Sequence, residues 1–506
     1  MNGYEFTPNS DGITTTLTKY TGPDTIVDIP GMDLDNRQVT VIGKDVFFDR
    51  TDLTSVIIPI SVTKISRSAF HNCTSLASVT INGPVTIIDD YAFQLCSGLT
   101  SITLPDSLET IGTTAFYGSG LTSVTIPSLV TKISRSAFDH CTSLKSVMIN
   151  GPVTIIDDYA FQLCSGLTSI TLPDSVKTIG GNAFYGCSSL ELVEMNLIES
   201  IGYAAFAGSG LTSITLPNSV MTIEAYAFAS SGLITITIPP LVTAIANNTF
   251  QNCGGLTSVT LTNSIDFIGV SAFAGSGLTS VTIPTSVKTI SNFAFHVCRS
   301  LSSVDLSNVE MIGVSAFSQS GLISVAMPSS VKTISNFAFH VCGSLSSVTL
   351  TNSITFIGVS AFAGSGLRSV TIPPLIKNIS DYAFHVCRSL TSVDFSNVEI
   401  IGVSAFAQSG VTSVILPDSI TIIDRAAFFD CRELTSINIP SFVTTIGGSA
   451  FEGCNLTGPF FIPKSVKFIG GHAFKYAGHF SSALVIPDAV IGVNAFEGTS
   501  FTFTIQ

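Results

Sequence analysis

The chain has 506 residues, of which 45% are hydrophobic and only 11% are charged. Its formal net charge of −13 disfavours binding to nucleic acid or to anionic lipid, because like charges repel each other. No run of about 18 or more apolar residues occurs, so the sequence predicts no membrane insertion.

The first 40 residues differ from the rest of the chain but have the composition of strands and turns. Residues 12–18 alternate apolar and polar side chains, which is typical of a strand. Residues 20–23 have the composition of a turn, and residues 26–30 are similar in sequence to a strand segment that recurs later. We expect residues 1–40 to form an N-terminal β cap, because the first coil of a stack otherwise exposes apolar surface and an unpaired strand edge. Residues 1–6 lack the basic and apolar segments of a secretory signal peptide, so no export signal is expected in them.

One unit then recurs between residues 41 and 498. Its most regular feature is a phenylalanine that returns every 22 or 23 residues, and a fixed period in that range is typical of a solenoid. This repeat phenylalanine occurs at Phe47, Phe70, Phe93, Phe116, Phe138, Phe161, Phe184, Phe206, Phe228, Phe250, Phe273, Phe295, Phe317, Phe339, Phe362, Phe384, Phe406, Phe428, Phe451, Phe474 and Phe496. The sequence therefore predicts an all-β-rich solenoid of about 21 coils, closed by a C-terminal cap strand over residues 499–506.

Each unit contains two apolar segments, and residues 121–133 illustrate both. Leu121, Val124 and Ile126 are expected to point inward from a short strand, with Thr and Ser between them pointing outward. The following Pro127 ends the strand because it has no N–H for the ladder. Val130 and Ile133 belong to a second inward-facing segment.

The repeat phenylalanines are expected to stack inside the coils at roughly 4.8 Å, the spacing of neighbouring strands. A single coil cannot bury its own apolar face without its neighbours. Phe273→Ala is therefore expected to cost roughly 3–5 kcal/mol and to unfold adjacent coils.

The cysteines also follow the repeat, each lying three residues after a repeat phenylalanine. They are Cys73, Cys96, Cys141, Cys164, Cys187, Cys253, Cys298, Cys342, Cys387, Cys431 and Cys454. An odd number of cysteines at one repeated position indicates small buried residues and free thiols rather than a disulfide framework. Several coils without cysteine carry a Gly-Ser-Gly turn instead, as at residues 118–120.

No residue pattern points to a reaction, a metal or a cofactor. His71, His296, His340 and His385 directly follow repeat phenylalanines, and the last three lie two coils apart, roughly 10 Å. That separation is too large for one shared metal ion, so we interpret these histidines as residues of the turns and not as metal ligands. The phosphate-binding, nucleophile-elbow and zinc-protease motifs do not occur. The sequence predicts a protein that is not an enzyme.

Two charged features have both a structural and a functional interpretation. The doublets at residues 89–90 and 157–158 could bind calcium, but they lack a glycine-rich calcium loop, and solvated turns are favoured. Arg299 and Arg388 recur after cysteine and are expected to form surface ion pairs with Asp305 and Asp394.

The outward-facing hydroxyl residues of the first strand segment are the candidate partner-binding residues. Hydroxyls both donate and accept hydrogen bonds, and regular spacing allows multivalent contact. The alternative is that serine and threonine simply suit solvent-facing strand positions. We call this surface the strand face, and its candidates are Thr100, Ser101, Thr103, Thr122, Ser123, Thr125, Thr168, Ser169, Thr171, Thr212, Ser213, Thr215, Thr279, Ser280 and Thr282.

The complete unit resembles the BspA-like, or Treponema-type, leucine-rich repeats. Residues 167–187 match it closely, reading Leu-Thr-Ser-Ile-Thr-Leu-Pro, then Asp-Ser-Val-Lys-Thr-Ile-Gly, then Gly-Asn-Ala-Phe-Tyr-Gly-Cys. The resemblance covers about nine-tenths of the chain. It implies a curved, right-handed leucine-rich-repeat coil stack with a strand-lined concave face. It also implies a surface or secreted protein of the kind that bacteria and protists use in adhesion.

Three functions remain open at this point. The first is an adhesion or recognition scaffold that binds a protein or glycan ligand through the strand face. The second is a lattice binder that meets ice, mineral or polysaccharide with a flat hydroxyl array. The third is a purely structural protein whose coils assemble end to end.

Overall fold

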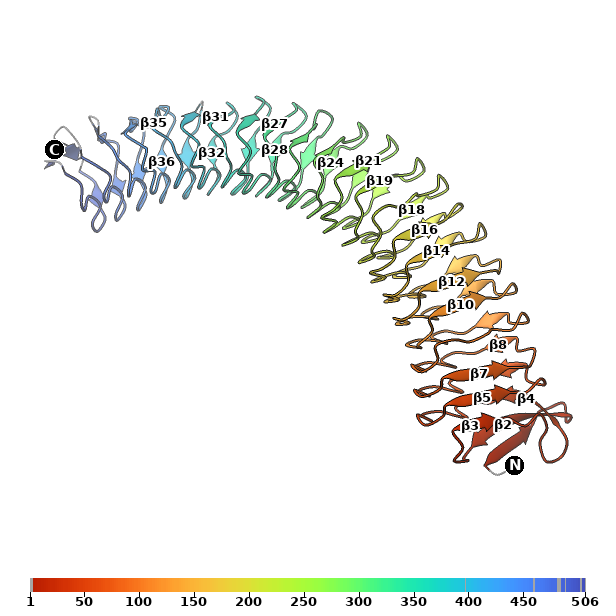
Figure 1. Cartoon of the computed structure of the whole chain (residues 1–506). Coiled ribbons are helices and arrows are strands. Elements are labelled where there is room, and N and C mark those ends of the chain that lie inside the picture. The colour runs from red at the N-terminus through yellow and green to blue at the C-terminus, as the bar shows by residue number, and fades with distance from the viewer. Residues whose placement is uncertain are drawn as a thin grey trace. The chain divides into compact units, whose positions relative to one another are not determined.

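The computed structural model describes residues 3–395, 397–457, 460–479, 484–486, 488–500 and 503–505. The chain divides into two compact units, Met1–Leu256 and Thr257–Gln506. Within the described ranges every regular element is a strand, and the coils are joined by turns rather than helices. Figure 1 shows the coils of each unit stacked side by side, one winding against the next. The predicted β-solenoid is confirmed.

Each coil of the first unit contributes up to two strands, as the two apolar segments predict. The N-terminal strands are β1 (Tyr4–Pro8), β2 (Thr14–Tyr20) and β4 (Gln38–Ile42). The first apolar segment forms β3 (Ile26–Asp28), β5 (Ser55–Ile58), β7 (Ser78–Ile81), β10 (Ser123–Ile126), β12 (Ser146–Ile149), β14 (Ser169–Thr171), β16 (Leu192–Glu194) and β19 (Thr235–Thr237). The second forms β6 (Lys64–Ile65), β8 (Ile87–Ile88), β9 (Thr110–Ile111), β11 (Lys132–Ile133), β13 (Ile155–Ile156), β15 (Thr178–Ile179), β17 (Ser200–Ile201), β18 (Thr222–Ile223) and β20 (Ala244–Ile245).

The second unit repeats this arrangement. Its first segments are β21 (Ser258–Thr260), β23 (Ser280–Val281), β25 (Ser303–Val304), β27 (Ser324–Ala326), β29 (Ser347–Thr349), β31 (Ser369–Thr371), β33 (Ser392–Asp394), β35 (Ser413–Val414), β37 (Ser436–Ile437), β40 (Leu484–Ile486) and β42 (Phe503–Ile505). Its second segments are β22 (Phe267–Ile268), β24 (Thr289–Ile290), β26 (Met311–Ile312), β28 (Thr333–Ile334), β30 (Phe356–Ile357), β32 (Asn378–Ile379), β34 (Ile400–Ile401), β36 (Ile422–Ile423), β38 (Thr445–Ile446), β39 (Phe468–Ile469) and β41 (Val490–Ile491). The predicted C-terminal cap strand at 499–506 lies partly outside the described residues, and within it β42 pairs in parallel with β40.

Equivalent strands of successive coils pair in parallel and in register within each unit. In the first unit Val124 of β10 lies opposite Val147 of β12, and Ile133 of β11 lies opposite Ile156 of β13. The inward residues are buried as expected, with Leu121, Ile126 and Ile133 at 0% exposure. Register therefore places like residues above like residues, so each apolar position becomes a continuous column.

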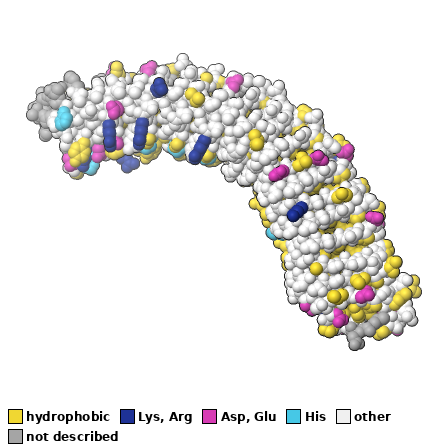
Figure 2. All heavy atoms as spheres, in the orientation of Figure 1, with side chains coloured by type: hydrophobic (Ala, Val, Ile, Leu, Met, Phe, Trp, Pro, Cys, Tyr) yellow, Lys and Arg dark blue, Asp and Glu magenta, His cyan; other side chains and the backbone are white. Residues whose placement is uncertain are grey.

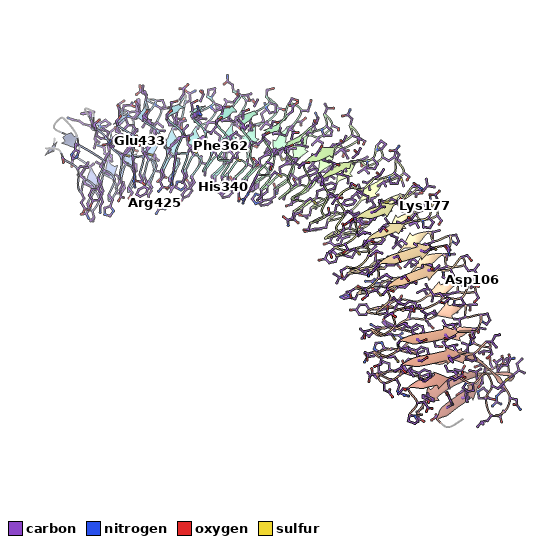
Figure 3. All side chains as sticks on the ribbon, viewed as in Figure 1. Asp106, Lys177, His340, Phe362, Arg425 and Glu433 are labelled. Carbon is purple, nitrogen blue, oxygen red and sulfur yellow. The ribbon has the colours of Figure 1, made fainter. Side chains whose placement is uncertain are left out.

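The repeat phenylalanines form the central column of each unit, and Figure 3 shows Phe362 inside the coil stack. Neighbouring rings within a unit are nearly parallel, tilted by 1° to 14°, with centroids between 5.0 Å and 5.7 Å apart. The predicted stacking is confirmed, and the centroid spacing is somewhat larger than the expected 4.8 Å.

A backbone ladder runs beside this column. The amide of Phe317 donates to the carbonyl of Ala338 in the next coil at 2.9 Å, and Phe295 donates to Ala316 at 2.8 Å. The same bond recurs in most other coils of both units. An alanine precedes the phenylalanine in most coils, and its carbonyl accepts this bond from the preceding coil.

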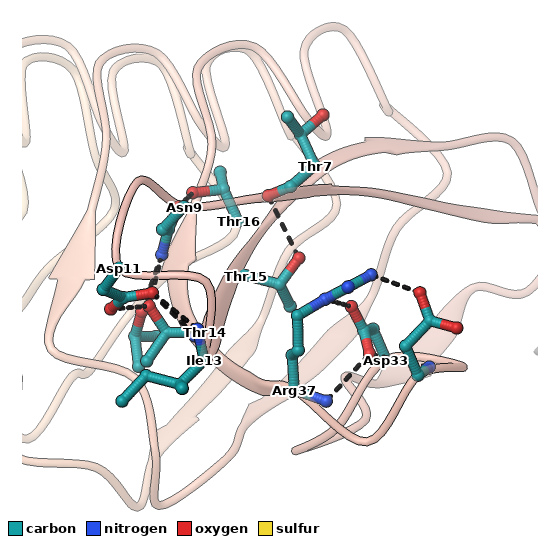
Figure 4. A network of polar contacts seen from close by, with 11 residues as sticks. Thr7, Asn9, Asp11, Ile13, Thr14, Thr15, Thr16, Asp33 and Arg37 are labelled. Carbon is teal, nitrogen blue, oxygen red and sulfur yellow. Dashed lines mark hydrogen bonds and ion pairs between the residues drawn. The ribbon is translucent and has the colours of Figure 1, made fainter.

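At the N-terminal end an antiparallel hairpin of β1 and β2 pairs with β4, and polar side chains fix its turns (Figure 4). Asp11 accepts hydrogen bonds from the amides of Ile13 and Thr14 at 3.0 Å and 2.9 Å. The hydroxyl of Thr15 is fully buried and donates to the Thr7 carbonyl at 3.0 Å. In the loop before β4, Arg37 donates to Asp33 at 2.8 Å. These bonds satisfy the polar groups that the hairpin covers.

All eleven cysteines are buried free thiols, and each occupies a column shared with serine. The coils without cysteine mostly place a serine at the same position, three residues after the repeat phenylalanine, and these serines are buried. Cys298, for example, donates its S–H to the Phe273 carbonyl at 3.1 Å and lies 3.4 Å from the hydroxyl of Ser276 in the preceding coil. The Gly-Ser-Gly segment is therefore more than the predicted substitute turn, because its serine takes the place of the thiol itself.

This column predicts different costs for two small substitutions at Cys298. Burial raises the pKa of the Cys298 thiol to about 11, so the sulfur keeps its proton and remains a donor at neutral pH. Cys298→Ser keeps a donor and should cost less than about 1 kcal/mol, whereas Cys298→Ala removes the donor and leaves a void, costing about 1–3 kcal/mol. Urea denaturation of both variants checks this, and a serine variant less stable than the alanine variant would contradict it.

Candidate functional site

The strand face lies where the sequence analysis placed it. All fifteen candidate residues are exposed, from Thr100 in the first unit to Thr282 in the second. They project outward because their apolar neighbours, such as Val124 and Ile170, point into the core. The segments around Thr100–Thr103 and Thr212–Thr215 run without strand pairing, while the other three triplets lie on or beside β10, β14 and β23.

The register shows that the hydroxyl array of the first unit is interrupted. Ser123, Ser146 and Ser169 lie opposite one another across β10, β12 and β14, but Leu192 follows them on β16. Thr125 lies opposite Met148. Hydroxyl coils therefore alternate with coils that carry exposed apolar side chains.

Charged side chains interrupt the same face. Lys145 donates its amide to the Thr122 carbonyl and Glu191 donates its amide to the Thr168 carbonyl, so both lie in the threonine row and both are exposed. Glu194 lies opposite Thr171 and accepts a hydrogen bond from its hydroxyl at 2.9 Å. Both signs of charge are thus present beside the hydroxyls.

Some of the candidate hydroxyls already have partners within the stack. Thr122 donates to the Thr100 carbonyl at 3.2 Å, and Thr279 donates to the Thr257 carbonyl at 3.4 Å. These threonines at the start of the strand segment bridge successive coils. The remaining members of each triplet are the better candidates for contact with a partner.

Several other charged groups form bonds between coils. Lys177, which Figure 3 labels, pairs with Glu199 at 3.5 Å. Asp89 of the first acidic doublet pairs with Lys64 at 3.0 Å, and Asp90 accepts the Thr113 amide at 2.8 Å. Partial burial acts to raise the pKa of Asp89, but the hydrogen bond and charge of Lys64 lower it overall. The doublets are bonded to both neighbouring coils rather than solvated as predicted.

The predicted ion pairs of Arg299 with Asp305 and of Arg388 with Asp394 are not formed among the described residues. Asp305 instead accepts the backbone amide of Ser307 at 2.9 Å. Arg388 lines a cavity of about 450 Å³ together with Asp430, Arg432 and Glu433.

The histidines of the second unit lie in the turns, as expected. His296 packs edge-on against Phe293, with ring centroids 5.7 Å apart, and His340 packs likewise against Phe337 at 5.6 Å. Figure 3 shows His340 at the edge of the stack. Burial lowers the pKa of His296, His340 and His385 below the usual 6.5. Within the described ranges, no group of three or more His, Cys, Asp or Glu side chains is close enough to hold a metal ion.

These lowered pKa values predict a loss of stability in mild acid. The unfolded chain binds protons at about pH 6.5 while the folded histidines remain neutral, so the free energy of unfolding falls as the pH drops below about 6.5. The triple variant H296Q/H340Q/H385Q uses a residue that Gln94 and Gln162 place at this position naturally. Its midpoint of thermal unfolding should fall less between pH 7 and pH 5.5 than that of the unchanged protein. If the unfolding midpoints of both proteins fell equally between pH 7 and pH 5.5, these histidines would not be the cause of the acid sensitivity.

One feature of the first unit was missed by the sequence analysis. Tyr203 lines three neighbouring concavities of about 430, 390 and 470 Å³. The first of them is also lined by Tyr185, Tyr226, Asn182 and Gln251. The sequence signal was a loosened repeat at residues 192–200, where a proline and one residue are missing, but the convergence of tyrosines from separate coils is visible only in the fold.

Charged side chains are sparse on the face that Figure 2 shows. In Figure 2 the visible face is mostly white, the colour of backbone and of side chains that are neither hydrophobic, charged nor histidine. In the described part of the chain, no helix is long and apolar enough to cross a membrane.

Comparison with known proteins gives a consistent picture of the repeat. The family model described as the BspA type leucine rich repeat region (6 copies) matches residues 29–145, 131–257, 193–302, 266–391 and 377–502. No curated protein matches the chain significantly.

Solved structures of other leucine-rich repeat proteins are similar over most of the chain. One from Bacteroides ovatus is 23% identical, with 95% of this chain and 98% of that chain covered and a TM-score of 0.36. A leucine rich cell surface protein from Faecalibacterium prausnitzii is 27% identical, with coverages of 86% and 93% and a TM-score of 0.30. The pneumococcal vaccine antigen PcpA is 16% identical, with coverages of 88% and 92% and a TM-score of 0.33. Because the family model matches nearly the whole repeat region, this chain belongs to the BspA-type leucine-rich repeat family.

Proposed function

We propose that the chain is a non-catalytic recognition scaffold that binds protein or glycan partners through the strand face. The observation that supports it is the alternation of hydroxyl and apolar coils on the first unit. Met148 is 60% exposed and Leu192 is 51% exposed, and each lies in register with exposed serine or threonine. Display at a cell surface or secretion is the setting that we propose from the family.

This alternation favours a protein partner. Protein interfaces combine a few apolar anchors with a surrounding polar rim. Met148 and Leu192 supply the anchors, and the hydroxyls of Ser146 and Ser169 supply the rim. Lys145 and Glu191 add charges of both signs, which fix the orientation of a partner more than its affinity.

A glycan is the second candidate ligand for the same face, because hydroxyl groups can pair with sugar hydroxyls in both directions. A crystalline lattice such as ice or mineral is less well supported, since Met148 and Leu192 break the hydroxyl array at alternate coils. End-to-end assembly is tested separately, by measuring the molar mass at high protein concentration. A monomer there argues against it.

The experiment compares variants of two faces in the same coils. The purified chain is probed against a panel of extracellular proteins and a glycan array. Thr125→Arg and Thr171→Arg are exposed substitutions on the strand face and should abolish binding. The control Thr131→Arg is exposed but lies beside the second strand segment, and it should bind normally.

Circular dichroism should show unchanged folding in all three variants. Binding that survives both strand-face substitutions would contradict the use of this face, and so would loss of binding in the control. No binding to any member of either panel would count against the proposal as a whole.

A further inference from the structure

The tyrosine-lined concavity of the first unit exists because two successive coils carry small residues at one position. The residue directly after the repeat phenylalanine is Tyr185, then Ala207, then Ala229, then Gln251 in four consecutive coils. Ala207 and Ala229 are buried and pack with Ala204 in one apolar cluster. Two short side chains between two long ones leave a depression of about 430 Å³. That volume lies within the range of small-ligand sites.

Aromatic rings form the walls of this depression. The rings of Tyr203 and Tyr226 are 5.4 Å apart between centroids and tilted by 56°. Tyr203 is 48% exposed and Tyr185 is 42% exposed, so part of each side chain is accessible to a ligand. Tyr226 packs against the alanine cluster and is the more buried of the three.

The polar groups that line the depression are uncharged, and most of them form no hydrogen bond within the described part of the chain. Asn182 and Gln251 supply amides at its two ends, and Ser230 supplies a hydroxyl. Within the described residues, the phenol groups of Tyr185 and Tyr203 and both amide side chains form no hydrogen bond with the protein. No charged side chain lines this concavity, although the chain carries a net charge of −13.

Backbone hydrogen bonds fix the turns that carry these side chains before any ligand arrives. The amide of Asn182 donates to the Tyr203 carbonyl at 2.7 Å, and the amide of Ser230 donates to the Gln251 carbonyl at 2.7 Å. The backbone amide of Tyr226 donates to the carbonyl of Asn247 at 3.1 Å. The loops that carry the site are therefore already hydrogen-bonded to the next coil. A ligand that binds there loses little affinity to the ordering of flexible backbone.

We propose that this concavity binds a neutral sugar ring, as a second recognition site separate from the strand face. A pyranose has an apolar C–H face that stacks on an aromatic ring with a negative π-face. Its hydroxyls lie around the edge, where amides and phenols both donate and accept hydrogen bonds. The absence of charged lining groups disfavours an anionic or cationic ligand at this concavity. A proline-rich peptide also favours aromatic grooves, but it offers few donors for two amide ends.

The test uses ligand-observed saturation-transfer NMR and isothermal titration with the whole chain. The probes are methyl β-D-glucopyranoside, N-acetylglucosamine, cellobiose and a proline-rich decapeptide. At least one sugar should bind saturably. Tyr203→Ala and Tyr226→Ala should weaken its binding about tenfold or more, whereas Tyr203→Phe keeps the stacking ring and should weaken it less.

Two further variants separate the pocket from general effects on the fold. Ala207→Leu fills the floor without removing an aromatic ring, and it should also weaken sugar binding. Tyr117→Ala removes a tyrosine at the repeat position of Tyr185 but outside the concavity, and it should bind sugar normally. Thr125→Arg on the strand face should leave sugar binding intact, so this proposal and the proposed function fail independently.

Failure of all three sugars to bind would overturn the proposal. Sugar binding that is unaffected by Tyr203→Ala and Ala207→Leu would overturn it as well, because the site would then lie elsewhere. Binding of the peptide in place of the sugars, lost in the same variants, would reassign the concavity to a peptide ligand.

Discussion

Phe317→Ala should lower the free energy of unfolding by about 3–5 kcal/mol, the cost of removing a fully buried phenylalanine. The ring is 0% exposed and stacks between Phe295 at 5.4 Å and Phe339 at 5.6 Å. Its loss leaves a void that faces both neighbouring coils, and in a repeat stack each coil depends on those neighbours. Chemical denaturation followed by circular dichroism measures the change.

Phe356→Ala is the matched control. Phe356 is the same residue type in the same unit, but it points outward from β30 and is 46% exposed. Its loss should cost less than about 1 kcal/mol. If Phe317→Ala were no more harmful than Phe356→Ala, the inner column would not carry the stability of the fold.

Gly321→Ala should be the second strongly destabilising change, because the added methyl group would collide with backbone atoms of the preceding coil. A Cβ at this position would lie 3.0 Å from the carbonyl carbon of Arg299 in the preceding coil and closer still to its oxygen. Both obstacles are backbone, so the coils must separate to admit a methyl group. We expect a loss of about 1–3 kcal/mol, typical of overpacking.

Gly343→Ala provides the comparison in an adjacent coil. Gly343 is exposed, and an added Cβ there would meet nothing within 4 Å. Alanine should be neutral or stabilise by about 0.4–1 kcal/mol, because it restricts the unfolded chain. Equal costs for the two substitutions would contradict the close approach of successive coils at Gly321.

The repeat could be predicted from the sequence because its signal is periodic. The 22–23-residue return of phenylalanine required an inner column, and the alternation around Val124 required one face inward and the other outward. Because the coils pair in register, one correct unit predicts all the others. The buried thiols followed from the same periodicity.

The turn backbone could not be predicted in the same way. Val297 and Val341 have left-handed backbone angles, with φ of 60° and 56°, which β-branched residues rarely adopt. Glycine occupies the same position in some other coils, as at Gly275 and Gly364. The stack imposes this conformation on every coil through bonds such as that from the Val341 amide to the Ala363 carbonyl at 2.7 Å. The hydrogen bonds between coils therefore outweigh the intrinsic preference of valine for negative φ.

The candidate sites also required the fold. The triplets rich in serine and threonine are visible in the sequence, but the residues that lie beside them in neighbouring coils depend on the strand register. Register places Met148 next to Thr125 and Leu192 next to Ser169, which changes a uniform hydroxyl array into a mixed one. The sugar site arises from side chains of four coils, and no single repeat contains it.

Hydrogen exchange read by mass spectrometry tests the central claim most directly, since that claim is a ladder that joins each repeat phenylalanine to the following coil. The amides of Phe295, Phe317 and Phe339 donate to alanine carbonyls one coil on, at 2.8–2.9 Å. We predict strong protection at repeat phenylalanines throughout both units, with a period of 22 or 23 residues. Protection confined to one segment, with the other repeat phenylalanines exchanging as in an unfolded chain, would contradict it.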